Sequence, residues 1–438
     1  MTTQYQPPQE SVIRLMTRLA LQHDAVNLSQ GITDEPAVYE MIWAGLAASL
    51  GGTDARMDRL ETLTLKDICD AQGSDPEAFL NRPLKNILAG LQDESDRFNQ
   101  YSFPFGLPEL REAIADYTHQ FYDYRPDPDD QITVTAGATE ALSSVLRALC
   151  APGDGLIIFQ PFHEMYPSQA NLFGLRPTYV TLKENHSAGR WEMDRDELKG
   201  AAANNCRAII LNSPHNPTGK VFSKDELEFI SSLCIEHDLL LITDEIYEHI
   251  LYGDHTHYCM ATFDGMAERT IIINSISKTA NASGWRVGWV LSPPEFTQPI
   301  RGVHDTLVVQ APTPLQKGAE RLLRLDKTFY RNIHPLFQQK RDALVTALQS
   351  IGFQATPPDG SYYLFANYRN VPALKDLAPM DAAMYLIQEI GVASVPGDNF
   401  YNKGDDGNNY LRFSFCRRLQ TLEEATKRLR MLDHEAPH

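Results

Sequence analysis

The sequence is poor in cysteine and contains no paired cysteine motif. Six cysteines are spread over 438 residues, with no CxxC pair and no cluster of histidine and cysteine at metal-ligand spacing. A disulfide-stapled secreted domain and a zinc module each require such a pattern. We therefore expect free thiols in a reducing compartment and no bound metal.

Long apolar runs are also missing. The strongest, Leu-Leu-Leu-Ile at 239–242, is far shorter than a membrane span of roughly 20 residues. The N-terminus, Met-Thr-Thr-Gln-Tyr-Gln-Pro-Pro, begins no apolar core of signal-peptide length. These absences predict no membrane partner and favour a cytoplasmic location.

Basic side chains are outnumbered. Lysine and arginine number 39 against 57 aspartate and glutamate residues, which gives a formal net charge of −18. Such a charge repels nucleic acid and anionic membrane surfaces. The length suggests two or three domains, and a composition of 43% hydrophobic residues is ordinary for a folded protein. The composition therefore favours a folded protein that acts on small molecules.

From about residue 98 onward, short apolar runs alternate with longer amphipathic stretches. This alternation is typical of an α/β sheet covered by helices on both faces. The predicted strands are Ile132–Thr135, Leu156–Phe159, Thr178–Leu182, Ala208–Leu211, Leu239–Thr243, Thr270–Asn274 and Val287–Leu291. Helices are predicted over Ala138–Leu149 and Lys224–His237, the second with Ser223 as its N-cap.

The pattern changes near residue 325. A helix over 327–350, a second helix near 380–390 and apolar segments at 360–368 and 410–415 predict a smaller α+β domain. We therefore divide the chain into an N-terminal segment (1–97), a large domain (98–324) and a C-terminal small domain (325–438). Residues 36–97 predict two or three short helices, which serve either as packing scaffold or as a lid over a site.

Three segments place polar residues at or just beyond predicted strand ends, where an α/β sheet presents groups to a ligand. They are Asn212–Lys220, which contains Asn-Pro-Thr-Gly, Thr243–Tyr247, which contains Asp244, and Ser275–Thr279, which contains Lys278. Each has an ordinary explanation when taken alone: a turn, a helix N-cap and a solvated lysine. Their order and spacing carry the information.

In that order and spacing the chain resembles the class I/II aminotransferases among the fold-type I pyridoxal-phosphate enzymes, most closely the kynurenine, glutamine and methionine aminotransferase branch. The similarity extends from Phe98 to about Leu432 and includes Val-Asn-Leu-Ser-Gln-Gly at 26–31. It implies aminotransferase fold type I, an α/β architecture in which a mostly parallel seven-stranded sheet forms the large domain beside a smaller α+β domain. It also implies pyridoxal 5'-phosphate as cofactor.

The resemblance assigns roles around the cofactor ring. Lys278 would form the Schiff base with the cofactor aldehyde and later move the α-proton of the substrate. Asp244 would keep the pyridine nitrogen protonated, which makes the ring an electron sink. Asn216 and Tyr247 would hydrogen-bond the phenolic oxygen. The ring-stacking position, usually aromatic in the family, falls on His163, whose imidazole either only stacks or also carries a proton.

A phosphate needs backbone donors, hydroxyl groups and a fixed cation. The resemblance implies that these groups come from Gly137, Ala138, Thr139, Ser275, Ser277 and Arg286. Tyr101 matches a tyrosine that reaches the phosphate of the neighbouring subunit, which implies a homodimer with active sites at the interface. Arg412, between apolar residues of a predicted strand, would bind the substrate carboxylate with Asn216 and the backbone of Gly31. An arginine paired with a core acid is the structural alternative for Arg412.

Two segments depart from the family pattern. Between Glu35 and Phe98 the chain is roughly 35–40 residues longer than the family requires, with the additional residues at about 36–80, which exceeds ordinary loop variation. Gly31 is followed by Ile-Thr-Asp where the family has an aromatic residue and a proline. Both segments border the substrate mouth in the family, so we expect a reshaped pocket.

The resemblance implies transfer of an amino group from an α-amino acid to a 2-oxo acid by a ping-pong mechanism. The same groups serve other reactions that begin with removal of the α-proton: β- or γ-elimination or replacement, cyclisation, or carbon–carbon bond formation in specialised metabolism, for example on an S-adenosylmethionine-like substrate. A non-catalytic effector domain of a transcription regulator is disfavoured by the negative charge, the lack of a helix-turn-helix extension and the presence of Lys278.

Overall fold

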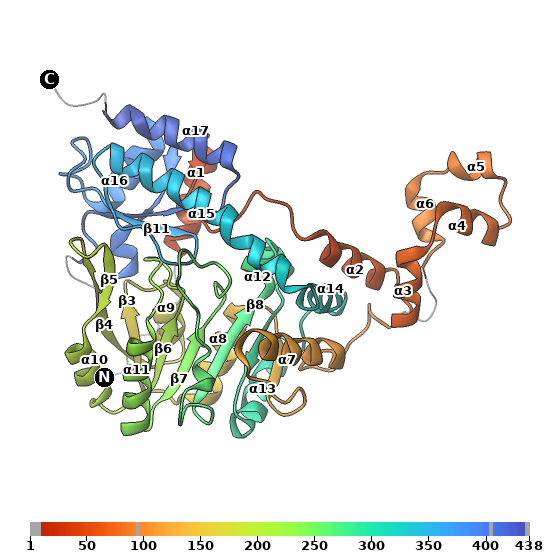
Figure 1. The fold of residues 1–438 in the computed structure, drawn as a ribbon, viewed down its shortest axis with the longest axis horizontal. Helices are drawn as coiled ribbons and strands as arrows, with labels where there is room; N and C mark the ends of the chain where they lie inside the picture. The colour runs from red at the N-terminus through yellow and green to blue at the C-terminus, as the bar shows by residue number, and fades with distance from the viewer. Residues whose placement is uncertain (1–9, 93–96, 403–405, 434–438) are drawn as a thin grey trace.

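The computed structural model describes residues 10–92, 97–402 and 406–433. Figure 1 shows a large sheet flanked by helices, a smaller α+β part stacked on it, and a helical segment that projects to one side. Among the helices of the described ranges, none has both the length and the apolar character needed to cross a bilayer.

The large sheet has eight strands in the order β2-β9-β8-β7-β6-β3-β4-β5. Their bounds are β2 Ile132–Thr135, β3 Gly155–Gln160, β4 Arg176–Asn185, β5 Arg190–Met193, β6 Cys206–Asn212, β7 Leu240–Asp244, β8 Thr270–Ser275 and β9 Gly288–Leu291. The five strands β8, β7, β6, β3 and β4 run parallel, while β9 and β5 are antiparallel to their neighbours. The seven predicted strands are all present. The predicted number of seven was one too low, because β5 extends the sheet by a hairpin with β4.

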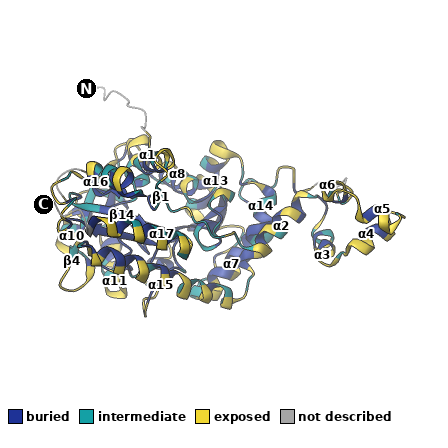
Figure 2. Cartoon of the chain, turned by 90° about the horizontal axis from the view of Figure 1, so that it is seen from above, coloured by how far each residue is buried: buried dark blue, intermediate teal, exposed yellow. Residues whose placement is uncertain are grey.

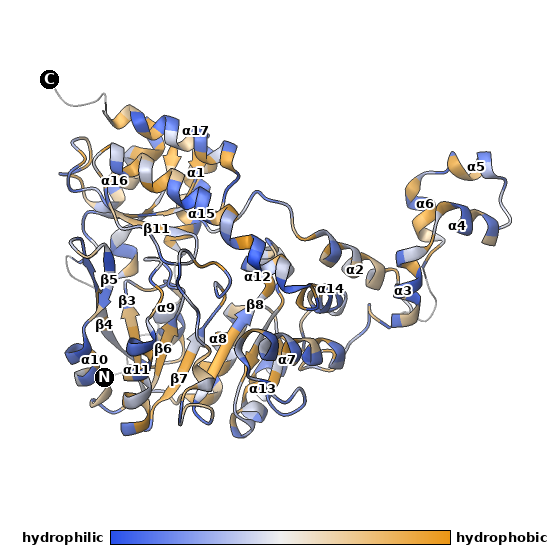
Figure 3. Ribbon diagram, viewed as in Figure 1, coloured by the Kyte–Doolittle hydropathy of each residue, from blue (hydrophilic) through white to orange (hydrophobic). Residues whose placement is uncertain are grey.

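The central strands are buried on both faces, and Figure 3 shows them as a hydrophobic block. Successive side chains of a strand point to opposite faces. Ile157 accordingly packs in the cluster with α11 (Lys224–Glu236), whereas Ile158 packs in the cluster with α8 (Ala138–Leu149) and α13 (Pro294–Val308). Ser223 caps α11 in a capping box with Glu226, as the sequence predicted for the N-cap.

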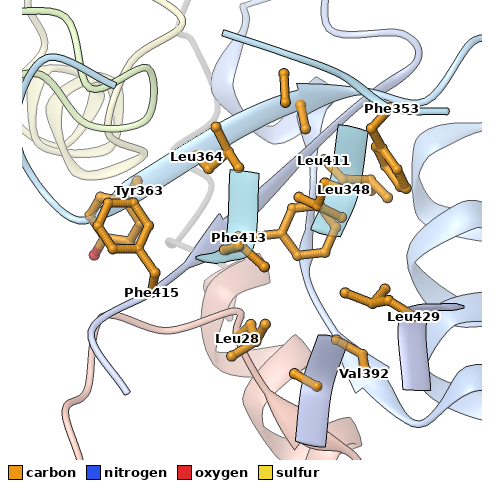
Figure 4. Close-up of a cluster of buried hydrophobic side chains, with 14 of the residues drawn as sticks. Leu28, Leu348, Phe353, Tyr363, Leu364, Val392, Leu411, Phe413, Phe415 and Leu429 are labelled. Atoms are coloured by element: carbon orange, nitrogen blue, oxygen red, sulfur yellow. The ribbon is translucent and has the colours of Figure 1, made fainter. Parts of the chain in front are cut away.

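The smaller part is built on the antiparallel sheet β10-β11-β14-β13. The bounds of its elements are β10 Gln354–Ala355, β11 Tyr363–Asn367, β12 Val392–Ala393, β13 Val395–Pro396, β14 Tyr410–Ser414, α15 Lys327–Ser350, α16 Pro379–Tyr385 and α17 Leu419–Leu429. The N-terminal α1 (Val12–Gln22) and β1 (Val26–Asn27) join it, with Val26 of β1 paired to Val392. Figure 4 shows Leu28 packed into the same apolar cluster as Phe413 and Leu429.

Residues 39–89 form five helices rather than the two or three that were predicted. They are α2 Tyr39–Ser49, α3 Asp54–Thr62, α4 Leu65–Ala71, α5 Pro76–Leu80 and α6 Leu84–Ala89. Helix α2 packs against α14 (Thr313–Leu323) in the large part. We call residues 54–91 the arm. The arm projects from the body and is largely exposed, apart from Met57 and Leu60, which are buried in a cluster of the body, and a small core of its own (Figures 1 and 2).

Candidate active site

A cavity of about 120 Å³ opens at the carboxyl ends of the parallel strands. Parallel strands present the residues that follow them at one edge of the sheet, which is the usual position of a ligand site in such sheets. The lining includes Ala138, Thr139, His163, Tyr166, Asp244, Tyr247, Ser275, Ser277, Lys278, Arg286 and Tyr363. The structure therefore gathers into one pocket most of the residues that the sequence analysis selected.

Asp244 is the last residue of β7 and lies at the floor of the cavity. Its Oδ2 accepts a hydrogen bond of 2.7 Å from the hydroxyl of Tyr166. Burial raises the pKa of Asp244 to about 6, and the bond from Tyr166 opposes that rise. Asp244 is therefore a partly buried carboxyl group suited to pair with a cationic ring nitrogen.

Lys278 is held on the short helix α12 (Ile276–Thr279), directly after β8. Its Nζ lies 5.6 Å from the ring centre of Tyr362 and 6.0 Å from that of Tyr247, and 3.5 Å from the carbonyl oxygen of Gly31. No carboxylate of the described residues forms an ion pair with it. Lys278 therefore faces the cavity without a salt bridge to an acid in this part of the chain.

Tyr247 projects from the turn beyond β7 and is almost fully buried. Burial raises the pKa of Tyr247 well above its ordinary value, so the hydroxyl keeps its proton. The hydroxyl oxygens of Tyr247 and Tyr363 lie 3.5 Å apart. Tyr247 thus offers a hydrogen-bond donor to the cavity.

Several hydrogen-bond donors surround the turn between β2 and α8. Gly137 has a φ of 84°, and a Cβ there would lie 2.4 Å from Nη2 of Arg286, so glycine is required. Arg286 is itself in the left-handed region with a φ of 56° and donates only to the carbonyl oxygens of Ala136 and Ser283, with no acid partner in the described part of the chain. The first N–H groups of α8 lack intrahelical acceptors. Together with Ser275 and Ser277, these groups form a cradle suited to phosphate.

Arg412, on β14, is 1% exposed, and it is joined to Asn216, another predicted substrate residue. Its Nη1 donates to Oδ1 of Asn216 at 2.9 Å, and its guanidinium carbon lies 4.3 Å from the ring centre of Tyr363. Nη2 donates to the carbonyl oxygen of Ser29 at 2.7 Å. Because no acid of the described ranges pairs with Arg412, the alternative of a core ion pair does not apply.

Gly31 lies on the other side of Tyr363. A Cβ at Gly31 would be 2.1 Å from the hydroxyl oxygen of Tyr363, so only glycine allows this close approach. Its carbonyl oxygen accepts from the hydroxyl of Tyr362 at 3.2 Å. Gly31 therefore lies between Lys278 and the tyrosine pair 362–363.

His163 lines the cavity as a neutral imidazole. Burial, together with the positive charges of Arg412 and Lys278, lowers the pKa of His163 to about 3. Its Nδ1 accepts a hydrogen bond from the backbone N–H of Met165, so Nε2 carries the single proton. The preceding Phe162 packs away from the cavity against Tyr179.

Tyr101 does not line this pocket. Its side chain is 81% exposed and borders a separate hollow together with Phe103, Leu107 and Thr313. Within the chain itself, Tyr101 is thus separated from the phosphate cradle.

The residues present fit pyridoxal 5'-phosphate on structural grounds. Nδ2 of Asn216 and Nε of Arg412 are buried without a hydrogen-bond partner in the described residues, although buried polar atoms are normally satisfied. The lysine, the carboxyl group of Asp244 and the phosphate cradle all face the same cavity. A phosphorylated aromatic aldehyde and an amino-acid carboxylate would together match this donor set.

Sequence reasoning missed three tyrosines of the site, Tyr166, Tyr362 and Tyr363. Tyr166 follows His163 by three residues, and this spacing at the start of α9 (Met165–Leu172) was a signal available in the sequence. Tyr362 and Tyr363 belong to the small sheet, and nothing local to their sequence indicates that they face the large domain. Their position depends on how the two parts pack.

Three residues buried behind Asp244 have ligand atoms close enough to one another to hold a metal ion: Glu245, Glu248 and His257. The oxygens of Glu245 already accept from Thr243 and His257, and those of Glu248 accept from Asn274, Tyr117 and Tyr122. We interpret the group as a hydrogen-bond network. It supports the cavity floor, because Asn274 also accepts from the backbone N–H of Ser275.

Comparison with known proteins agrees with this geometry. The sequence profile "Aminotransferase class I and II" matches residues 73–429. The chain is 31% identical to human kynurenine–oxoglutarate transaminase 1 over 94% of its length and 93% of that protein.

Two solved structures show the same similarity. The N-succinyldiaminopimelate aminotransferase of Mycobacterium tuberculosis superposes with a TM-score of 0.83 at 30% identity, covering 97% of both chains. An Escherichia coli protein with a methionine aminotransferase function superposes with a TM-score of 0.79 at 30% identity, covering 98% of this chain and all of that one. These relatives do not favour the diverted chemistries over amino transfer. The chain therefore belongs to the class I and II aminotransferases, pyridoxal-phosphate enzymes of fold type I that transfer an amino group between an α-amino acid and a 2-oxo acid.

Proposed function

We propose that the cavity is the catalytic site and that Lys278 both holds the cofactor and moves the α-proton of the substrate. The observation that carries the proposal is the convergence of Lys278, Asp244 and Arg286 on one cavity. When bound, the cofactor supplies an electron-withdrawing ring that stabilises negative charge at the substrate α-carbon. Asp244, oriented by Tyr166, favours the protonated pyridine nitrogen that this chemistry requires.

Proton transfer by Lys278 requires its uncharged amine. The proposal is supported by the position of Lys278 on the cavity wall and by the absence of a carboxylate salt bridge to it in the described residues. Tyr247 and Asn216 contribute hydrogen bonds to the phenolic oxygen, since the first is a protonated hydroxyl and the second has a free Nδ2. His163 stacks as a neutral ring and carries no proton between substrate and solvent near pH 7.

Arg412 binds the substrate carboxylate in this proposal, with Asn216 and the backbone of Gly31 beside it. The unpartnered Nε of Arg412 supports the assignment, because a carboxylate would satisfy it. We further propose substrates with uncharged side chains. The names of relatives include kynurenine and methionine but also N-succinyldiaminopimelate, so the support comes from the cavity lining, which includes the apolar side chains of Leu142, Met165 and Ile246.

We also propose that the enzyme is a cytoplasmic homodimer in which Tyr101 completes the phosphate site of the partner subunit. Support comes from the exposure of Tyr101 and of the neighbouring Phe103, together with exposed apolar residues at 307–309.

We propose that the chain is divided into an N-terminal segment (residues 1–97), a cofactor domain (98–324) and a small domain (325–438). The pairing of β1 with β12 supports placing the first segment beside the small domain, whereas the arm contacts the large part through Asp54 and Lys317.

The role of Lys278 is tested by borohydride reduction of the holoenzyme followed by peptide mass mapping. We expect the cofactor to be found covalently attached to the peptide that contains Lys278, and to be absent from that peptide in Lys278→Ala. Attachment to another lysine in the wild-type protein would contradict the proposal.

The role of Tyr101 is tested by mixing two inactive proteins, Lys278→Ala and Tyr101→Ala. If Tyr101 acts across the interface, each hybrid dimer contains one site with both residues intact, and activity returns on mixing. A mixture that forms hybrid dimers and stays inactive would show that both residues serve the same subunit's site.

A further inference from the structure

His304 is a buried histidine outside the cavity. It contacts two separate segments: the first turn of α8, beside the phosphate cradle, and the segment that carries Tyr101. It lies on α13 and is 0% exposed. Its Nδ1 is 3.0 Å from Oε2 of Glu140, and its Nε2 is 2.9 Å from the carbonyl oxygen of Pro104. Glu140 is in the first turn of α8, and Pro104 follows Tyr101 by three residues.

Both contacts require a donor from the ring. A carbonyl oxygen and a carboxylate only accept, whereas a neutral imidazole donates from one nitrogen alone. The imidazolium form satisfies both partners. Burial alone would lower the pKa of His304, but the adjacent Glu140, with smaller contributions from Pro104 and Asp305, raises it overall.

Glu140 transmits this contact to the phosphate turn. Its Oε2 accepts from the backbone N–H of Ala136 at 3.0 Å, and its Oε1 accepts from Ser144. The carbonyl oxygen of the same Ala136 accepts from Arg286. The residue that precedes Gly137 is therefore held on both sides, by a carboxylate and by a guanidinium.

A carboxylate so close to a phosphate site would repel the ligand unless its charge were balanced. We propose that His304 is a positioning residue for the cofactor phosphate: its cation neutralises Glu140, fixes the Ala136–Thr139 turn, and through Pro104 anchors the segment that carries Tyr101. The inference depends on the proposed function of this turn as the phosphate cradle. The segment is held at a second point, since the carbonyl oxygen of Phe105 accepts from the N–H of Val134.

The test compares the affinity of the apoprotein for pyridoxal 5'-phosphate with its affinity for pyridoxal, which has the same aldehyde and ring but no phosphate. For His304→Gln we expect affinity for pyridoxal 5'-phosphate to fall about 10- to 100-fold, the range for losing a hydrogen bond to a charged group, while affinity for pyridoxal changes by less than about twofold. His249→Gln alters a histidine that, unlike His304, is neutral because burial lowers its pKa to about 3, and it should leave the ratio unchanged.

A double variant separates charge balance from a merely structural role. Adding Glu140→Gln to His304→Gln removes the unbalanced anion, so most of the lost preference for the phosphorylated ligand should return. This variant buries no unpaired charge and keeps the test available if the single variant does not fold. If the single variant does not fold, the preference of the double variant for pyridoxal 5'-phosphate over pyridoxal should lie within about fivefold of the wild-type preference.

Three outcomes would overturn the inference. The first is an unchanged ratio of the two affinities in His304→Gln, and the second is an equal loss of affinity for both ligands in that variant. The third is a double variant whose preference for pyridoxal 5'-phosphate is reduced as much as predicted for His304→Gln alone. A wild-type protein with no preference for pyridoxal 5'-phosphate over pyridoxal would instead contradict the proposed phosphate cradle. The two failures are therefore distinguishable.

Discussion

The catalytic cavity and the arm are built in opposite ways. The cavity is lined by residues from Ala138 to Tyr363, with Gly31 and Arg412 beside it, brought together by the ends of parallel strands and by the packing of the small sheet on the large one. The arm is a continuous stretch, residues 54–91, whose small core consists of Ile68, Cys69, Phe79 and Ile87. Each position in the cavity thus depends on the whole fold, whereas the arm depends mainly on itself.

This difference indicates where the molecule tolerates change. The arm is tied to the body at its base, where the buried ammonium group of Lys317 pairs with Asp54. Its distal helices pack on one another, and within the described segments they form no hydrogen bond or ion pair with the residues that line the cavity. Altering the arm should therefore leave the chemistry intact, while altering a single cavity residue should not.

The largest effect is expected for Lys278→Ala. Loss of both cofactor attachment and the proton carrier should lower kcat/KM by at least about 10³-fold. Lys66→Ala in the arm removes a lysine whose side chain is 81% exposed, and it should change kcat/KM by less than about twofold. Steady-state kinetics on both variants would show comparable losses if the contrast between cavity and arm were wrong.

Arg412→Lys should be the next most damaging change. Lysine keeps the charge but loses the planar fork, so KM for the amino acid should rise about 100-fold while cofactor occupancy stays complete. Arg417→Lys is the matched control, because Arg417 donates to the carbonyl oxygen of Asn27 away from the cavity. If Arg412→Lys loses the cofactor rather than substrate affinity, the carboxylate role is wrong.

Asp244→Asn should alter the pH dependence of apoprotein stability. Since folding raises the pKa of Asp244 from 3.8 to about 6, the protonated form stabilises the fold at low pH, and this contribution is lost as the pH rises through about 6. The free energy of unfolding of Asp244→Asn, relative to wild type, should therefore grow by about 1.5 kcal/mol between pH 5 and pH 8. Urea unfolding at both pH values measures it, and a constant difference would contradict the raised pKa.

The smallest effect on the cavity is expected for Phe79→Ala. Phe79 is 1% exposed in the core of the arm, so its loss should increase hydrogen exchange in α4–α6 while kcat/KM stays within about twofold. Phe365→Ala, equally buried but in the body, should lower global stability by about 3–5 kcal/mol. If Phe79→Ala lowered kcat/KM well beyond twofold, as a change in the body could, the arm and the cavity would be coupled.

Much of the body was predictable because local patterns determine it. Buried strands such as β2 and helices such as α8 and α15 have the predicted bounds, since their apolar periodicity agrees with their tertiary contacts. The motifs at strand ends predicted the cavity residues for the same reason: parallel strands bring their carboxyl ends to one edge.

The remainder depends on contacts that no local pattern encodes. Strand β5 is short and contains Arg190 and Glu192, so its pattern is weak, and it forms through pairing with β4. Tyr363 enters the cavity only because the small sheet docks on the large one. The arm has polar helices with few buried positions, which explains both the underestimated number of helices and the lack of any signal for its projection from the body.

The central claim, amino transfer by this cavity, is tested most directly by a single half-reaction. Holoenzyme is mixed with an uncharged amino acid such as methionine or kynurenine in the absence of any 2-oxo acid, and the released products are quantified. The account predicts one equivalent of the corresponding 2-oxo acid per subunit, with the reaction stopping there until a 2-oxo acid is added. Repeated turnover without an acceptor, with release of a side-chain fragment or ammonia, would contradict it.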